Sequence, residues 1–409
     1  MADIIPFRGT YYNPANIKDL SKAVAPPYDV ISPEEQDMLY GSDPYNIVRI
    51  LLGKDYPGDN DKENKYTRAC RFLEDWQKKN ILKKNEKESI YVYSQDFSID
   101  GQKKKRTGFI ALLKLEEFGQ GADIYPHENT LSAPKEDRAR LIQAIEANLG
   151  PVFVLFGDEG QHVESILEES MKPQPLIDIM DYQGINNRLW HISDKDTVKA
   201  IVRLMKDKKL FIADGHHRYE VGLNFSKLKK DPRYGYILTY FTNLYADGIV
   251  ILPVHRLISG VGNGPAAEVL KDIEKTFTVR KIASKSDIKG FLSSAGPSER
   301  RFVLYMRHRI MGLSLEGKDL LDVDVLHDLI IEPLRKKAEA RHEKISIDFT
   351  KDMDYAINEV DGKSSSFSAI LNPVSISQIR DRAFSGKRMS QKSTYFYPKI
   401  LTGLVINVF

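Results

Sequence analysis

The chain has 409 residues, of which 42% are hydrophobic and 29% charged, and its formal net charge is +3. This composition excludes a disordered chain, because disordered chains combine low hydrophobicity with high net charge. The near-neutral balance also argues against a nucleic-acid partner, which requires a basic face. No apolar stretch reaches the roughly 18 residues that a membrane span requires.

The single cysteine, Cys70, cannot form an internal disulfide, and such a chain fits a reducing compartment. The first residues, MADIIPFRGTYY, lack the charged and then apolar pattern of a secretion signal. We therefore expect a cytoplasmic protein without a membrane partner.

Two short strand-like runs open the chain, at residues 4–12 and 45–52. Between them Ser32 is placed to cap a helix that Pro33 opens, with acidic residues in its first turn. The first 50 residues therefore predict a mixture of strands and one capped helix.

Residues 66–79 carry apolar side chains at helical spacing, which predicts a helix. A β-hairpin follows, with its turn at Asp100 and Gly101. The densest basic run, KKKR at 103–106, is interpreted as the solvated end of this hairpin.

A second capped helix is predicted to start at Ser132 or beside it and to stop at Gly150. A buried strand is predicted at 151–157, and a helix at 196–209. Helices and strands then alternate irregularly between about 262 and 365.

This irregular order predicts a mixed α/β fold of the α+β kind, with mixed sheets in two interleaved lobes. The first lobe is expected at 1–260. The second is expected at 261–409, and its C-terminal segment, about 366–409, is expected to return to the cleft.

The stretch LFIADGHHRYEVGLNF, residues 210–225, begins as a buried strand and continues as an amphipathic helix. At such a joint the first N–H groups of the helix and its dipole favour an anion, typically a phosphate. The residues at the joint are Asp214, Gly215, His216, His217 and Arg218.

Gly215 allows the backbone to bend or to approach a guest closely, and Arg218 offers a bidentate fork to phosphate oxygens. The imidazoles of His216 and His217 can add donors or a proton. Asp214 can orient a histidine or hold a magnesium ion. The structural alternative is that Asp214 only caps the helix and that the histidines lie on the surface.

A zinc or iron site at His217, Glu220 and His216 is a rival interpretation, because His217 and Glu220 are three residues apart. Adjacent histidines usually point apart on a helix, and no third ligand has a diagnostic spacing. We therefore favour the anion.

The stretch YPHENTLSAPKEDRARLI contains a second group of candidates. His127 and Glu128 lie in a loop before the helix, and Lys135 and Arg138 lie in its first turns. Cations there oppose the helix dipole, so they suit an anionic ligand, and Glu128 is a candidate general base. The alternative is a capping loop followed by a solvated charged helix.

A third group lies in GKRMSQKSTYFYPKILTGLV, where Lys392 and Ser393 stand among aromatic residues. Polar donors between aromatic rings can line a small-molecule pocket, although a closing strand packed by residues 395–397 fits as well. Weaker candidates for substrate binding are Asp29, His255 and Arg256.

Six motifs in order, APPYDVIS, HENT, PKEDR, ADGHHRYE, PVHR and GKRMSQKSTYFYPKILTGL, resemble those of the domain-of-unknown-function family 1015 over nearly the whole chain. ADGHHRYE also resembles the phosphate loop of the ParB and sulfiredoxin superfamily. The free serine kinases of that superfamily have a similar loop and a catalytic glutamate, and the resemblance places that role on Glu128. It also implies a link to serine and phosphoserine metabolism.

Together these features predict an enzyme that transfers a phosphoryl group to a small hydroxy compound, with a free serine kinase as the leading hypothesis. The alternatives are a phosphoserine phosphatase, with His216 or His217 as covalent acceptor or acid, and a non-catalytic nucleotide-binding regulator. Expected ligands are a small substrate and ATP or ADP with magnesium. A homo-oligomer is left open.

Overall fold

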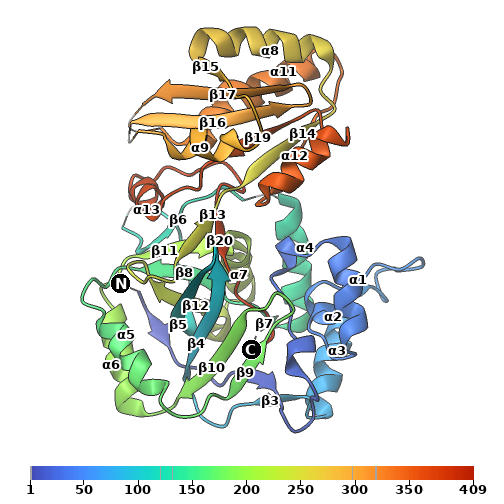
Figure 1. Ribbon diagram of the computed structural model, residues 1–409. Coiled ribbons are helices and arrows are strands. Elements are labelled where there is room, and N and C mark those ends of the chain that lie inside the picture. The colour runs from blue at the N-terminus through green and yellow to red at the C-terminus, as the bar shows by residue number, and fades with distance from the viewer. Residues whose placement is uncertain (1, 120, 131, 297, 318–319) are drawn as a thin grey trace. The chain divides into compact units, whose positions relative to one another are not determined.

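The computed structural model describes residues 2–119, 121–130, 132–296, 298–317 and 320–409. The chain divides into two compact units, of which unit 1 comprises Met1–Val250 and Pro398–Phe409 and unit 2 comprises Ile251–Tyr397. The chain returns to unit 1 after it completes unit 2, so the units interleave in sequence. Both combine helices with β-sheet, and the predicted mixed α+β class is confirmed (Figure 1).

A mixed β-sheet forms the centre of unit 1 (Figure 1). The strands of this unit are β1 (Ile4–Ile5), β2 (Thr10–Tyr12), β3 (Leu82–Lys84), β4 (Ile90–Ile99), β5 (Gln102–Lys114), β6 (Ile124–Pro126), β7 (Ala147–Asn148), β8 (Val152–Phe156), β9 (Ile177–Met180), β10 (Asn186–Ile192), β11 (Leu210–Asp214), β12 (Tyr236–Asn243) and β21 (Asn407–Val408). The sheet has the order β6–β11–β8–β12–β5–β4–β10–β9, and β1 pairs with β5. Strand β11 runs parallel to β6 and antiparallel to β8, which in turn runs parallel to β12.

Helices cover this sheet and form a second apolar core beside it. They are α1 (Pro33–Ser42), α2 (Val48–Leu51), α3 (Lys65–Lys78), α4 (Ser132–Ile145), α5 (His162–Ser170), α6 (Lys195–Met205) and α7 (His216–Lys229). Helices α5 and α6 bury their apolar residues against the sheet, whereas α1 to α4 share a core with the C-terminal strand region. Residue 131, next to the start of α4, lies outside the described residues.

Several predicted elements are confirmed by their local chemistry. The Ser32 hydroxyl accepts a hydrogen bond from the Glu35 N–H, and Pro33 is the first residue of α1. Asn64 caps α3 through a capping box with Thr67. The predicted hairpin, the strand at β8 and the helix at α6 are also present.

Three predictions for unit 1 were wrong. Residues 45–52 contain the short helix α2 and no strand, because the Asn46 side chain accepts a hydrogen bond from the Val48 N–H and starts a helical turn. Helix α4 ends at Ile145, where Glu146 adopts a left-handed conformation, before Gly150 is reached. Arg106, assigned to a solvated hairpin end, is fully buried.

Unit 2 is an antiparallel sheet with helices against it (Figure 1). The sheet has the order β15–β17–β16–β19–β14–β18. The strands of this part of the chain are β13 (Val250–Leu252), β14 (His255–Ser259), β15 (Thr278–Lys281), β16 (Glu299–Met306), β17 (Arg309–Glu316), β18 (Ser346–Thr350), β19 (Phe367–Leu371) and β20 (Tyr395–Tyr397). Its helices are α8 (Asn263–Thr276), α9 (Asp287–Ser293), α10 (Asp322–Leu326), a π-helical segment (His327–Ile331), α11 (Glu332–Glu339), α12 (Met353–Asp361) and α13 (Ile376–Phe384).

The core of unit 2 lies where α9 and α12 pack on β14, β16 and β19. In neither unit does a described helix combine the length and the apolar character that crossing a bilayer requires.

Candidate functional site

The centre of the candidate site is the turn between β11 and α7. Gly215 has a φ of +91°, in the left-handed region that favours glycine, and an added Cβ there would lie 3.0 Å from the Arg218 guanidinium. The pairing of β11 with β8 shifts register between Ile212 and Asp214, as at a β-bulge. Bulges are common beside functional sites because they redirect a side chain. The predicted strand-to-helix joint is therefore present and has an irregular backbone.

Two cations meet the carboxylate of Asp214. The Arg218 Nη2 atom donates to Asp214 Oδ2 at 2.5 Å, and Lys399 Nζ forms an ion pair with Oδ1. The three side chains are only 11–15% exposed. Arg218 also donates to the Pro151 carbonyl. Two cationic side chains therefore meet at one carboxylate beside the start of α7.

A buried network holds Lys399 at this place. Arg106 donates to the carbonyl of Pro398 and to the side-chain oxygen of Gln95. Gln95 in turn donates to the Lys399 carbonyl at 3.0 Å. Arg106 therefore fixes the backbone that carries Lys399. Lys399 belongs to the third group, GKRMSQKSTYFYPKILTGLV, as one of its basic residues, whereas Arg106 was placed in the solvated basic run. The contact between Lys399 and Asp214 spans 185 residues, so no local pattern could have revealed it.

His127 and His216 form a buried pair. Their ring centroids are 4.7 Å apart and nearly perpendicular, and the His127 N–H donates to His216 Nε2 at 3.4 Å. The His127 ring nitrogen Nδ1 lies 2.6 Å from the Ile212 carbonyl, so Nδ1 carries the proton. Burial lowers the pKa of His127 to about 4, which leaves this imidazole neutral at pH 7. The pair therefore joins the HENT loop to β11 and α7.

The HENT loop and the start of α4 also contact α7 through Glu220. Thr130 Oγ1 donates to Glu220 Oε2 at 2.8 Å, and Lys135 Nζ forms an ion pair with the same oxygen at 3.0 Å. We expected the fold to gain nothing from a cation at Lys135, and this ion pair corrects that expectation. Glu128 and His217 are both half-buried.

Arg138 is likewise engaged within the protein. It donates to Asp137 Oδ2 through Nε at 2.9 Å and to the Leu51 carbonyl at 2.6 Å, and it lies 4.2 Å from the centroid of the Tyr28 ring. Burial alone would raise the pKa of Asp137, but the Arg138 charge and the hydrogen bonds outweigh it and hold that pKa below its usual value. Arg138 therefore stabilises the fold, contrary to our expectation.

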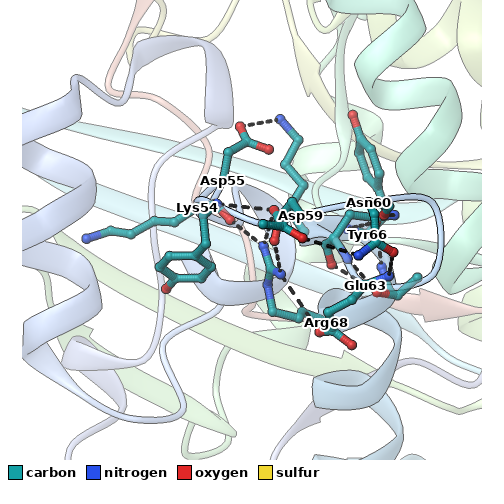
Figure 2. Close-up of polar contacts among 12 residues, drawn as sticks. Lys54, Asp55, Asp59, Asn60, Glu63, Tyr66 and Arg68 are labelled. Atoms are coloured by element: carbon teal, nitrogen blue, oxygen red, sulfur yellow. Dashed lines mark hydrogen bonds and ion pairs between the residues drawn. The ribbon is translucent and has the colours of Figure 1, made fainter.

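Asp137 also belongs to a network of charges around the loop that precedes α3. Lys65 lies 3.3 Å from Asp137 and 3.1 Å from Asp55. Arg68 forms a two-pronged pair with Asp59, with both contacts at 2.7 Å (Figure 2). In this network each cation has at least one carboxylate partner.

A cavity of about 60 Å³ connects the two groups of candidates. Among the described residues, Tyr28, Arg138, Gly150 and Arg218 line it. Burial raises the pKa of Tyr28, so its hydroxyl remains a hydrogen-bond donor at neutral pH. One water takes roughly 30 Å³ of liquid volume, so the cavity holds only small groups. The 127–138 and 214–218 segments thus converge on one side of unit 1.

The remaining candidates are Asp29 in unit 1 and Lys392, Ser393, His255 and Arg256 in unit 2. Asp29 is exposed in a short 3₁₀ helix of unit 1 (Tyr28–Val30). Lys392 and Ser393 belong to unit 2, where Lys392 has a φ of +53° and Ser393 donates to the Ser390 carbonyl at 2.5 Å.

His255 and Arg256 also belong to unit 2, and both are buried in β14. His255 Nδ1 accepts a hydrogen bond from the Leu371 N–H at 3.2 Å. Burial and the neighbouring Arg256 lower the pKa of His255 to about 4. Arg256 donates to the Val254 carbonyl and lies 5.6 Å from the Phe349 ring centroid. Through these contacts His255 and Arg256 both contribute to the packing of unit 2.

The geometry does not fit a magnesium ion held by Asp214. Each carboxylate oxygen already faces a cation, Arg218 or Lys399, and a third cation would be repelled. Within the described ranges no group of three or more His, Cys, Asp and Glu side chains is arranged to hold a metal ion, at His216, His217 and Glu220 or elsewhere. The charge at this turn is instead suited to an anion.

The fold and the turn define a mixed α/β protein with a positively charged, partly buried strand-to-helix joint. The model of the family described as "Protein of unknown function (DUF1015)" matches residues 4–375. The chain belongs to this family, as the order of the six motifs predicted. No curated protein sequence matches it.

Several solved structures are similar to this chain at low identity. A conserved hypothetical protein from Pyrococcus furiosus is 11% identical, with 70% of this chain and 92% of that chain covered and a TM-score of 0.40. A free serine kinase in complex with AMP is 11% identical, with 70% and 89% covered and a TM-score of 0.40. C-terminally truncated SbnI from Staphylococcus aureus is 11% identical, with 73% and 87% covered and a TM-score of 0.40.

Proposed function

We propose that the chain transfers a phosphoryl group to the hydroxyl of a small compound, with free serine as the preferred acceptor. The observation that carries the proposal is the left-handed Gly215 turn at the start of α7, where Arg218 and Lys399 both pair with Asp214. Phosphoryl transfer requires mainly positioning and the stabilisation of negative charge, which such a turn supplies.

In this proposal the phosphate lies at the start of α7. Gly215 permits close approach, and the backbone of His216 and His217 together with the Arg218 guanidinium bind phosphate oxygens. Lys399 adds a second charge, and Asp214 keeps both cations oriented. Because the cavity beside Arg218 measures about 60 Å³, it admits a phosphate group, and a nucleoside has to lie outside it.

Glu128 is the proposed general base. It follows His127, whose contacts with His216 and Ile212 bring the HENT loop to the turn. The acceptor hydroxyl oxygen attacks the terminal phosphorus of ATP or ADP while the bond from that phosphorus to the bridging oxygen breaks. The shortened nucleotide leaves with the electron pair, and the hydroxyl proton passes to Glu128.

Substrate contacts from Asp29 and Lys135 remain part of the proposal. The phosphatase alternative needs an accessible imidazole as acceptor. His216 is buried and its Nε2 accepts a hydrogen bond, which makes His217 the more accessible of the two proposed acceptors.

The test combines a substrate screen with two variants. Purified protein is incubated with serine and ATP, ADP or pyrophosphate, and separately with phosphoserine alone, and products are followed by ³¹P NMR. We expect phosphoserine to form with one of the donors. Glu128→Gln should lower the rate by roughly 10²–10⁴-fold and leave nucleotide affinity nearly unchanged, because only proton transfer is lost.

A control variant distinguishes an effect on folding from an effect on the rate of phosphoryl transfer. Glu136→Gln removes a carboxylate that is exposed on α4 and pairs with Arg140 at the surface, so the rate should stay unchanged. Phosphate release from phosphoserine alone would select the phosphatase, and nucleotide binding without turnover would select the regulator. Equal rates for Glu128→Gln and the natural chain would remove the base assignment.

A further inference from the structure

A second ligand-sized groove lies in unit 1 on α6. Its volume is about 810 Å³, within the range of roughly 300–1,000 Å³ typical of pockets that hold small molecules. None of the residues that line it is a candidate for phosphoryl transfer. The groove is therefore a separate feature of the fold.

The floor of the groove is apolar. Helix α6 contributes Val198 and Val202, which are four residues apart and so lie on one side of the helix. The chain at β1 contributes Ile4, Ile5 and Pro6. Because Ile5, Pro6 and Val202 are only half-buried, this floor keeps apolar surface that a ligand can cover.

Cations form the rim. Lys195, Lys199 and Arg203 follow one another at intervals of four residues on α6, Lys206 comes three residues later, and Lys87 adds a further charge. Among the residues that the structure describes, none of these five side chains takes part in an ion pair, and Glu88 is the only acid that lines the groove.

This column of like charges is unfavourable for the helix itself. Cations at intervals of three and four residues repel one another, and nearby carboxylates normally relieve that repulsion. The helix dipole favours Arg203 in the last turn of α6, but the repulsion within the column remains, and an anion in the groove would neutralise it.

We propose that the groove binds a small amphipathic anion, with its apolar body on the valines and β1 and its carboxylate on the lysine and arginine rim. The apolar floor selects the body and the unpaired cations select the charge. The proposal does not depend on the phosphoryl-transfer site.

Isothermal titration calorimetry of the full chain with decanoate, below its micelle concentration, tests the proposal. We expect one decanoate per chain. Decanol and decyltrimethylammonium should bind at least about tenfold more weakly, because the first lacks the charge and the second reverses it. Affinity for decanoate should also fall as sodium chloride is added.

The double variant Lys199→Glu with Arg203→Glu should lower decanoate affinity at least about tenfold. Circular dichroism should show an intact fold, because both side chains are exposed. The matched control, Lys103→Glu with Lys105→Glu, makes the same charge change at the exposed end of the β4–β5 hairpin and should bind as the natural chain does. Val202→Asn tests the floor and should also weaken binding.

Failure of the natural chain to bind decanoate would overturn the proposal. Equal affinity in the charge-reversed variant, or equal affinity for decanol, would do the same. Binding to anionic vesicles without binding of free decanoate would indicate a membrane-facing surface and would also contradict a small-molecule groove.

Discussion

Two groups of arginines and carboxylates in unit 1 differ in their charge balance. Around the loop before α3, Lys65 is shared by Asp55 and Asp137, and Arg68 is paired with Asp59 (Figure 2). At the Gly215 turn, two cations share one carboxylate. In the first group each of these cations has a carboxylate of its own, whereas in the second Arg218 and Lys399 meet at Asp214, an arrangement that we propose holds an additional anion.

The difference teaches that a basic residue in a motif is not by itself a ligand-binding residue. Arg138 and Arg218 both line the small cavity, yet Arg138 is held by Asp137, the Leu51 carbonyl and the Tyr28 ring. Arg218 lies beside the left-handed Gly215 turn at the start of α7, and we propose that this position, rather than membership of a motif, distinguishes binding from packing.

The largest effect is expected when Asp214 is removed. Asp214→Ala leaves Arg218 and Lys399 facing each other with little exposure, and breaking such a pair typically costs about 3–5 kcal/mol in the free energy of unfolding. Inorganic phosphate should restore part of this loss, because the anion takes the place of the carboxylate. Urea unfolding with and without phosphate measures both effects.

Asp59→Ala is the control for this experiment. It removes a carboxylate from the charge-balanced network, and phosphate should not stabilise it more than it stabilises the natural chain. If phosphate rescues both variants equally, the excess charge at the Gly215 turn is not a specific anion site.

The next effect concerns pH. The pKa of His127 is about 4 in the folded chain against about 6.5 when unfolded, so between these values the unfolded chain binds the extra proton. The contribution of His127 to the free energy of unfolding is therefore complete above pH 6.5. It is lost as the pH falls towards 4, by roughly 3 kcal/mol. The carboxyl of Asp137, whose folded pKa is lowered, loses its contribution only below about pH 3.8.

Hydrogen exchange of the β11 and α7 amides at pH 7 and pH 4.5 provides the local measurement. His127→Asn has no titrating imidazole and should lose less protection between the two pH values. His255→Asn is the matched control in unit 2 and should leave the pH dependence of β11 and α7 as it is. An unchanged acid response in His127→Asn would contradict the assignment.

Local sequence patterns predicted the parts of the site that neighbouring residues determine. The apolar run of β11 followed by Asp214 and Gly215 predicted the strand, the turn and the start of α7, because glycine conformation and helix geometry are local. The α+β class followed similarly from the order of elements.

Long-range contacts explain what the sequence could not predict. Arg106 looked like part of a solvated basic run, but its buried partner, the Pro398 carbonyl, is 292 residues away. Helix α2 looked like a strand because its side chains are apolar and branched, and the capping contact from Asn46 determined the outcome. The carboxylate that pairs with Lys135, Glu220, lies 85 residues away on α7, and the Leu51 carbonyl that accepts from Arg138 lies 87 residues away.

A smaller effect should separate the two arginines of the cavity. Arg218→Lys keeps the charge but loses the planar fork, so the affinity for inorganic phosphate should fall by about 1–3 kcal/mol. Arg138→Lys should reduce the stability of the fold and leave phosphate affinity nearly unchanged. Calorimetric titration with phosphate, beside a melting curve for each variant, measures both, and equal losses of affinity would remove the distinction.

The smallest effect is expected in the network of Figure 2. Arg68→Lys cannot reproduce the two 2.7 Å contacts with Asp59 or the 2.8 Å bond to the Lys54 carbonyl. Because this pair is partly exposed, with each side chain just under one fifth accessible, the loss should be about 1 kcal/mol or less in the free energy of unfolding. Phosphate affinity should stay at the natural value, since no cation is taken from the Gly215 turn. If Arg68→Lys weakens phosphate binding as strongly as Arg218→Lys does, the charge-balanced network participates in anion binding and the contrast between the two groups is wrong.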